Sequence, residues 1–159
     1  MISASLDMLE ESLNKKIDIL SRIEEQNEIQ KDVLSNYETV DEAAFDATVD
    51  EKGRLIDQLN SLDEGFQNLF DRVKGDIGNN KEQYADQIRR MQRLIQEITG
   101  KSASIEASEH RNKRLAEKYF SISRERMSQS KQSSSAAFNY YQTMNNFKNI
   151  PPQFMDTKN

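Results

Sequence analysis

The chain has 159 residues, of which 31% are charged and 35% hydrophobic, and its formal net charge is −5. It contains no cysteine, which excludes a disulfide framework and every thiolate-based metal or nucleophilic site. No apolar run approaches the roughly 20 residues of a membrane span, and the first residues resemble no signal peptide. We therefore expect a soluble, cytoplasmic protein without membrane insertion.

Charge divides unevenly between the two halves of the sequence. Residues 1–80 carry 19 acidic and 8 basic side chains, whereas residues 81–159 carry 8 acidic and 14 basic ones. Because opposite charges attract, we expect the two halves to dock on one another within a self-complementary bundle. The same asymmetry could instead attract a charged partner.

Five glycines and two prolines leave few helix breakers, and apolar residues recur at spacings of three and four. This pattern predicts helices at about 4–36, 40–77 and 80–130. The first helix carries a stripe made of Leu6, Leu9, Leu13, Ile17, Leu20 and Ile23. Asn27 and Gln30 interrupt the stripe, so the second half of this helix is expected to pack more loosely or to face something else.

The second predicted helix opens at Thr39, because Thr39 and Glu42 have the spacing of a capping box. Its apolar positions follow a near-heptad register from Phe45 to Ile77. Gly53 allows a break near residue 50, with a short helix before it and a longer one after it. The segment is expected to end at Gly75 and Gly78.

The third predicted helix starts near residue 80, where Asn79 and Glu82 again have capping-pair spacing. A four-three repeat runs from Tyr84 to Tyr119 and is typical of a coiled coil. Gly100 lies inside this repeat and could mark a bend. Three polar residues in the seam can fix register or partner choice at some cost in packing: Ser102, Glu109 and Asn112.

The third helix is predicted to outrun its partners. At 1.5 Å per residue, a helix over 80–130 measures about 75 Å, against about 48 Å for the first helix. Its seam over 105–127 is then expected to be uncovered, and exposed apolar stripes mark interaction surfaces. The candidate binding residues on this stripe are Ile105, Leu115, Tyr119, Phe120, Ile122 and Met127.

The sequence therefore predicts an all-α protein, an antiparallel three-helix bundle over 1–131 with an extended third helix. Residues 132–159 form an expected flexible tail, serine-rich at first and then aromatic, with a short helix predicted at 136–147. We hypothesise that its aromatic residues Phe138, Tyr140 and Tyr141 fold back over the exposed stripe and compete with a bound partner.

No catalytic constellation is recognisable. His110 is the one histidine, and without cysteine or a second histidine neither a di-iron motif nor an acyl-transfer site can be assembled. Arg89, Arg90 and Arg93 make a basic cluster, but aromatic interleaving is lacking and the whole chain is acidic. We expect no enzymatic activity, no cofactor or metal, and no nucleic-acid binding.

Several stretches of the sequence resemble the FlgN family of flagellar export chaperones, in particular clostridial-type members. The matching stretches cover most of residues 5–156 and include 50–59 (DEKGRLIDQL), 62–66 (LDEGF), 80–84 (NKEQY), 136–141 (AAFNYY) and 151–156 (PPQFMD). The resemblance implies a cytoplasmic chaperone that binds the carboxy-terminal helical regions of hook-filament junction (hook-associated) proteins. Such a chaperone prevents premature assembly of its cargo and hands it to the flagellar type III export apparatus.

Two other interpretations fit the same pattern. A self-associating coiled-coil or adaptor protein without an export role would bury the overhang of the third helix in a homodimer. A FliT-like chaperone, or an adaptor of another type III secretion system, would differ in cargo rather than in mechanism. The seam of the third helix is common to all three, so the sequence alone does not separate them.

Overall fold

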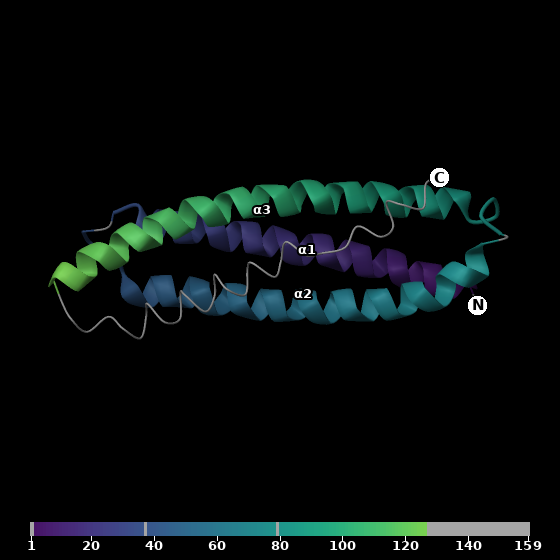
Figure 1. Cartoon of the computed structure of the whole chain (residues 1–159), viewed down its shortest axis with the longest axis horizontal. Coiled ribbons are helices and arrows are strands. Elements are labelled where there is room, and N and C mark those ends of the chain that lie inside the picture. The colour runs from purple at the N-terminus through teal and green to yellow at the C-terminus, as the bar shows by residue number, and fades with distance from the viewer. Residues whose placement is uncertain (1, 37, 79, 127–159) are drawn as a thin grey trace. The chain divides into compact units, whose positions relative to one another are not determined.

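The computed structural model describes residues 2–36, 38–78 and 80–126. They form three α-helices, α1 (Ile2–Leu34), α2 (Glu42–Ile77) and α3 (Ala85–Arg126), and the described residues contain no strand (Figure 1). With 42 residues, α3 is longer than α1, which has 33, and α2, which has 36. The prediction of an all-α three-helix bundle with an extended third helix is confirmed.

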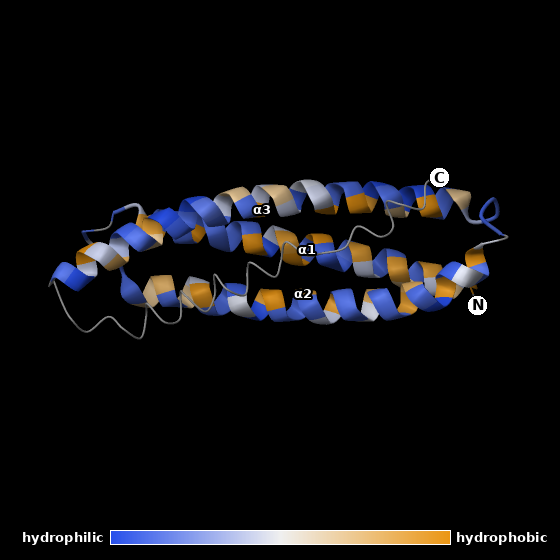
Figure 2. Cartoon of the chain, in the orientation of Figure 1, coloured by the Kyte–Doolittle hydropathy of each residue, from blue (hydrophilic) through white to orange (hydrophobic). Residues whose placement is uncertain are grey.

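The described residues divide into two compact units, and each helix contributes one stretch to each unit. Unit 1 comprises residues 2–21, 57–78 and 80–102, and unit 2 comprises 22–36, 38–56 and 103–126. Hydrophobic positions recur between hydrophilic ones along all three helices, as the amphipathic spacing requires (Figure 2).

The core of unit 1 is almost wholly aliphatic and aromatic. Its buried apolar residues are Leu6, Leu9, Leu13, Leu20, Leu59, Phe70, Val73, Ile77, Met91, Ile95 and Ile98. Lys16 of α1 is also buried, and its Nζ lies 2.7 Å from Oδ1 of Asp63 in α2. Glu10 of α1 pairs with Arg90 of α3 at 3.0 Å. The acidic first half and the basic second half of the sequence therefore meet at this pair.

The core of unit 2 is mixed. Its buried apolar residues are Ile23, Leu34, Phe45, Val49, Leu55, Ile56, Ile105, Ala116 and Tyr119, and buried polar residues lie among them. Gln30 and Asn27 of α1 bond Thr48 and Lys52 of α2, in that order, so α1 and α2 are antiparallel. Lys52 and Glu42 bond Glu109 and Tyr119, so α2 and α3 are antiparallel as well.

The start of α2 differs from the predicted capping box. The helix begins at Glu42, and Oδ1 of Asp41 accepts a hydrogen bond from the backbone N–H of Ala44 at 3.2 Å. The N–H of Phe45 then bonds the carbonyl oxygen of Asp41 at 3.0 Å. Asp41 is therefore the N-cap, because its short carboxylate satisfies an amide of the first turn, and the expected cap at Thr39 was wrong.

The start of α3 at residue 80 was also wrong. The amide of Gln83 bonds the carbonyl oxygen of Asn80 at 3.1 Å, and the amide of Ala85 bonds that of Glu82 at 3.4 Å, so residues 80–84 form turns. The first bond of α-helical spacing runs from Ile88 to Tyr84 at 2.9 Å. Hydrogen bonds of turns, between residues three apart, compete here with the hydrogen bonds of an α-helix, between residues four apart. Asn79 of the expected capping pair lies outside the described residues.

Gly53 and Gly100, the two glycines at which a break or bend was considered, do not interrupt their helices. α2 is continuous through Gly53 and α3 through Gly100, so the predicted break near residue 50 was wrong. Neither glycine has a positive φ, and a Cβ at either position would meet nothing within 4 Å. Glycine lowers helix propensity by about 1 kcal/mol, a cost that the packing of the flanking apolar residues outweighs.

Candidate functional site

The most distinctive feature of unit 2 is a buried polar layer, to which all three helices contribute. We define it as Asn27 and Gln30 of α1, Lys52 of α2, and Glu109 and Asn112 of α3. Four of the five are fully buried, and Glu109 is 7% exposed. Asn27 and Gln30 were expected to mark either looser packing or a half-helix that faces something else. They lie in the core, where side chains of the other helices are partners for their amides.

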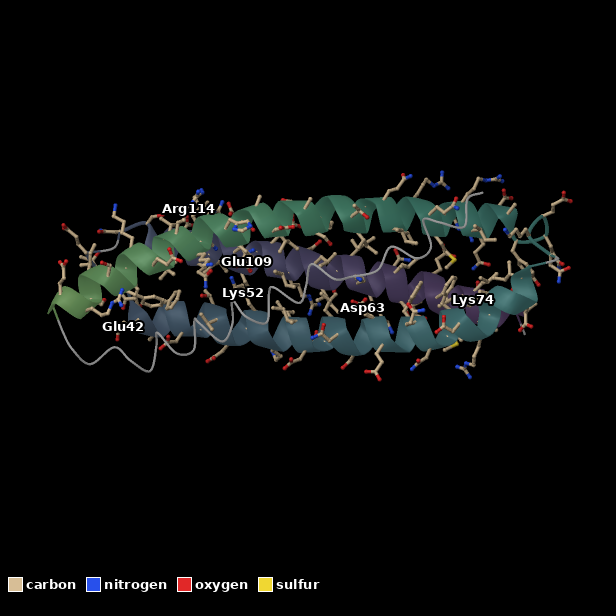
Figure 3. The ribbon with its side chains drawn as sticks, in the orientation of Figure 1. Glu42, Lys52, Asp63, Lys74, Glu109 and Arg114 are labelled. Carbon is tan, nitrogen blue, oxygen red and sulfur yellow. The ribbon has the colours of Figure 1, made fainter. Side chains whose placement is uncertain are left out.

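Lys52 is the centre of the layer. Its Nζ donates to Oδ1 of Asn27 at 2.7 Å, to Oε1 of Gln30 at 2.9 Å, and to both carboxylate oxygens of Glu109 at 2.9 and 3.1 Å. Figure 3 shows the side chains of Lys52 and Glu109 pointing toward one another from α2 and α3. An ammonium group has three N–H donors and no acceptor, and here its three residue partners come from two different helices.

The neutral members complete the hydrogen bonding. Nδ2 of Asn112 donates to the backbone oxygen of Asn27 at 2.9 Å and to Oε1 of Gln30 at 3.1 Å. Nε2 of Gln30 donates to Oγ1 of Thr48 at 3.1 Å, and Nδ2 of Asn27 donates to Oγ of Ser108 at 2.7 Å. Buried polar groups that find partners in this way avoid most of the penalty for leaving water.

Burial shifts the ionisation of both charged members. Desolvation lowers the pKa of Lys52 to about 8, although the nearby Glu109 carboxylate opposes the shift. Desolvation likewise raises the pKa of Glu109, while Lys52 and the hydrogen bond from Asn27 oppose it. Each charge therefore lies in an environment that disfavours it, and each is held there by the other.

The rim of the layer carries a second ion pair. Nη2 of Arg111 lies 2.7 Å from Oε2 of Glu28, and its Nε donates to Oδ1 of Asn112 at 3.1 Å. The hydrogen bond from Arg111 lowers the pKa of Glu28. Because Glu28 is exposed, this pair adds little stability, but it shows which residues of α1 and α3 lie side by side.

Within the described residues, no group of three or more His, Cys, Asp or Glu side chains is arranged to hold a metal ion. His110 lies on the surface, with Nε2 3.9 Å from Oε1 of Glu106, and takes no part in the polar layer. No helix in the described part of the chain is long and apolar enough to cross a membrane.

The residues predicted to bind a partner are split by the structure. Ile105 and Tyr119 are buried, at 0% and 5% exposure, so the expected uncovered seam over 105–127 was wrong for them. Leu115, Phe120 and Ile122 are half-buried, and we call these three residues the terminal patch. Met127, the tail residues Phe138, Tyr140 and Tyr141, and the expected helix at 136–147 all lie outside the described residues.

The register of the helices explains this split. Glu42, the first residue of α2, accepts a hydrogen bond from the Tyr119 hydroxyl at 2.8 Å, so α2 covers the seam of α3 as far as that turn. Phe45 contacts Tyr119 and Phe120 edge-on, with ring centroids 6.1 and 5.8 Å apart. The described helix continues only to Arg126, and the seven residues from 120 to 126 measure about 10 Å.

Lys52 is the functional candidate that sequence reasoning missed. It occupies a heptad seam position, three residues after Val49 and four before Ile56, both of which are buried. Glu109 and Asn112 are recognisable in the sequence as polar seam residues, but their pattern alone does not connect them with a charge of opposite sign on another helix. The signal available in the sequence was a lysine at a seam position of one helix and a glutamate at a seam position of another.

Comparison of the chain with protein-family models, with curated proteins and with solved structures gave no match.

Proposed function

We propose that this protein is a cytoplasmic export chaperone for hook-filament junction (hook-associated) proteins. It binds their carboxy-terminal helical segments, prevents premature assembly, and aids delivery to the flagellar type III export apparatus. The resemblance of its sequence to the FlgN family suggests this cargo, and the terminal patch supplies a contact surface. A three-helix unit with apolar side chains left half-covered at one end suits the capture of an amphipathic helix.

The observation that carries the proposal is the spacing within the terminal patch. Leu115 and Ile122 are seven residues apart, which places them on one face of α3, and buried Tyr119 lies between them on that face. Phe120 extends the apolar surface toward α2, where its ring packs against Phe45. The rings of Phe45 and Tyr119 hold the Phe120 ring in place, which lowers the conformational entropy that Phe120 loses on binding.

The direct test is calorimetric titration of the full chain with carboxy-terminal segments of hook-associated proteins from a flagellated clostridial relative. We expect saturable binding of micromolar or tighter affinity. Ile122→Glu should abolish it, because it places a charge on the apolar contact face. Ser121→Glu is the matched control, since it adds the same charge at an exposed neighbouring position and should bind as the unmodified chain does.

Two results would contradict the proposal. Absence of binding to every segment by folded protein would remove the chaperone function. A concentration-dependent dimer that Ile122→Glu dissociates would show that a second copy covers the terminal patch, as a self-associating adaptor requires.

Tyr119 is unsuitable for this test, because it is buried against Phe45 and its replacement by a charged residue would unfold the end of unit 2.

A further inference from the structure

The polar layer joins side chains of all three helices through hydrogen bonds that depend on the register of the helices. Lys52 of α2 supplies donors, Asn27 and Gln30 of α1 supply amide oxygens, and Glu109 of α3 supplies the opposite charge. Every one of these side chains is at least nine-tenths buried. None of them can therefore exchange its protein partners for water while the unit stays closed.

A shift of one heptad removes these partners. On α1, the residues seven positions from Asn27 are Leu20 and Leu34, and neither can accept a hydrogen bond from Lys52 through its side chain. Of the residues seven positions from Gln30, Ile23 has no acceptor and Tyr37 has a single hydroxyl, so a shift in either direction loses at least one of the two amide acceptors. On α3, the residues seven positions from Glu109 are Ser102 and Ala116, and neither carries a charge. A shift of α1 would therefore remove amide acceptors from Lys52, and a shift of α3 against α2 would bury the Lys52 ammonium and the Glu109 carboxylate apart from one another.

The apolar seam positions of unit 2 are far less selective. Ile23, Ile56 and Ile105 would be buried against any Leu or Ile, whether it came from the same chain, a shifted register or a second copy. An apolar four-three repeat thus favours the association of helices but does not select their register or their partners. The choice must come from groups that penalise wrong pairings.

We infer that the polar layer of Asn27, Gln30, Lys52, Glu109 and Asn112 selects one register of the three helices, and thereby disfavours every association of these helices in another register, within one chain or between copies. The layer acts as a specificity device of the core. This inference does not depend on the proposed function, since it concerns the chain without any cargo.

The test replaces the layer by apolar residues of similar size in the full chain, as Asn27→Leu, Gln30→Leu, Lys52→Met, Glu109→Leu and Asn112→Leu. Molar mass is measured by light scattering over a dilution series. We expect the unmodified chain to keep the mass of one 18.4 kDa chain, and the substituted chain to form dimers or larger species at the same concentrations.

Register is measured separately by cross-linking, which the absence of cysteine makes clean. The reporter for the observed register is Glu28→Cys with Arg111→Cys, because these residues form an ion pair between α1 and α3. The reporter for a one-heptad shift is Glu28→Cys with Lys118→Cys, at an exposed position. A short bismaleimide should link only the first pair in the native layer and both pairs in the apolar layer.

The exchange variant Lys52→Glu/Glu109→Lys is the matched control, since it keeps opposite charges at the two positions. We expect it to stay monomeric and to cross-link only in the observed register. An apolar-layer chain that stays monomeric and cross-links only at 28 and 111 would overturn the inference. So would an apolar-layer chain that does not fold, because the layer would then be needed for folding itself and not for choosing a register.

Discussion

Lys52 brings a positive charge into the mixed core of unit 2, and its effect on stability depends on whether the Glu109 carboxylate is present opposite it. A buried ion pair gains attraction in a low-dielectric interior but loses the hydration of both charges, so its net contribution is small or unfavourable. Removal of only one partner leaves the full desolvation cost of the other. The pair and its members therefore have different effects on stability.

We predict that Lys52→Met lowers the free energy of unfolding by about 3–5 kcal/mol, because it leaves the Glu109 carboxylate buried without its countercharge. The double variant Lys52→Met/Glu109→Leu should lie between no change and a gain of up to about 4 kcal/mol. Urea unfolding followed by circular dichroism measures both. A single variant as stable as the unmodified chain would show that Glu109 is hydrated or protonated in the folded state.

The same pair should give stability a distinctive dependence on pH. The pKa of Glu109 is raised in the folded state, so just above 4.5 the folded state binds more protons than the unfolded state, and stability falls as pH rises through that window. The pKa of Lys52 is lowered to about 8, so between 8 and 10.5 the unfolded state binds more protons, and stability rises with pH.

Urea unfolding from pH 4.5 to 10.5 should show both slopes, each at most about 1.4 kcal/mol per pH unit, in the unmodified chain. The variant Lys52→Met/Glu109→Leu should lack both slopes. Glu11→Gln/Lys15→Gln, which removes an exposed pair on α1, should retain them and serves as the control. Identical profiles for the unmodified chain and the double variant would contradict the assignment.

At the scale of the element, the first turn of α2 has two candidate N-cap residues in the sequence, Thr39 and Asp41, and mutation can distinguish them. Asp41→Ala should lower the free energy of unfolding by about 0.5–2 kcal/mol, because it removes the acceptor for the Ala44 amide. Thr39→Ala should stay within about 0.5 kcal/mol of the unmodified chain, since Thr39 is exposed and lies outside the helix. The reverse order in thermal or urea unfolding would place the cap at Thr39.

The helices were predictable from apolar spacing, whereas their ends depended on competition between local hydrogen bonds. The stripes through Leu6, Leu13 and Leu20, and through Phe45 and Ile56, fall in the observed cores. The start of α3 was placed five residues early, because turns at Asn80 and Glu82 satisfy the same amides that a helix would use. A sequence pattern does not indicate whether a turn or the first turn of a helix has the lower free energy at such a site.

The candidate site was predictable only in part, for a reason that belongs to the element scale as well. Glu109 and Asn112 were visible as polar interruptions of a seam, and Asn27 and Gln30 as interruptions of another. Whether such residues face water or one another depends on the register of the three helices along the bundle. This register is a property of the tertiary structure and cannot be read from one helix alone. The overhang was overestimated for the same reason, since α2 reaches Tyr119 through Glu42.

At the scale of the whole molecule, the charge asymmetry of the sequence is partly used within the chain. Acidic residues of α1 pair with basic residues of α3, as Glu10 does with Arg90 and Glu28 with Arg111. These pairs are partly exposed, so they add little to stability and weaken with salt. Their value lies in orientation, because they favour α3 beside α1 over the docking of a second acidic half.

The terminal patch also makes the aromatic tail testable as a competitor of the cargo. If Phe138, Tyr140 and Tyr141 cover the patch part of the time, cargo must displace them, and its apparent affinity is reduced by the covered fraction. We therefore predict that Phe138→Ser/Tyr140→Ser/Tyr141→Ser in the full chain tightens cargo binding in calorimetric titration. This prediction rests on the proposed function, since it needs a cargo that binds.

The matched control for the tail is Asn145→Ser/Asn146→Ser/Asn149→Ser, which changes three tail residues without removing an aromatic ring and should leave affinity unchanged. Unchanged affinity in the aromatic variant would mean that the tail does not compete for the patch. Weaker binding would mean that the tail contributes contacts to the cargo, because stacking and burial of its rings would then be lost from the complex rather than from the free chain. Ile122→Glu separates these two explanations further. If cargo and tail bind the same terminal patch, this substitution should weaken cargo binding. If the tail alone holds the cargo, the affinity for cargo should not change.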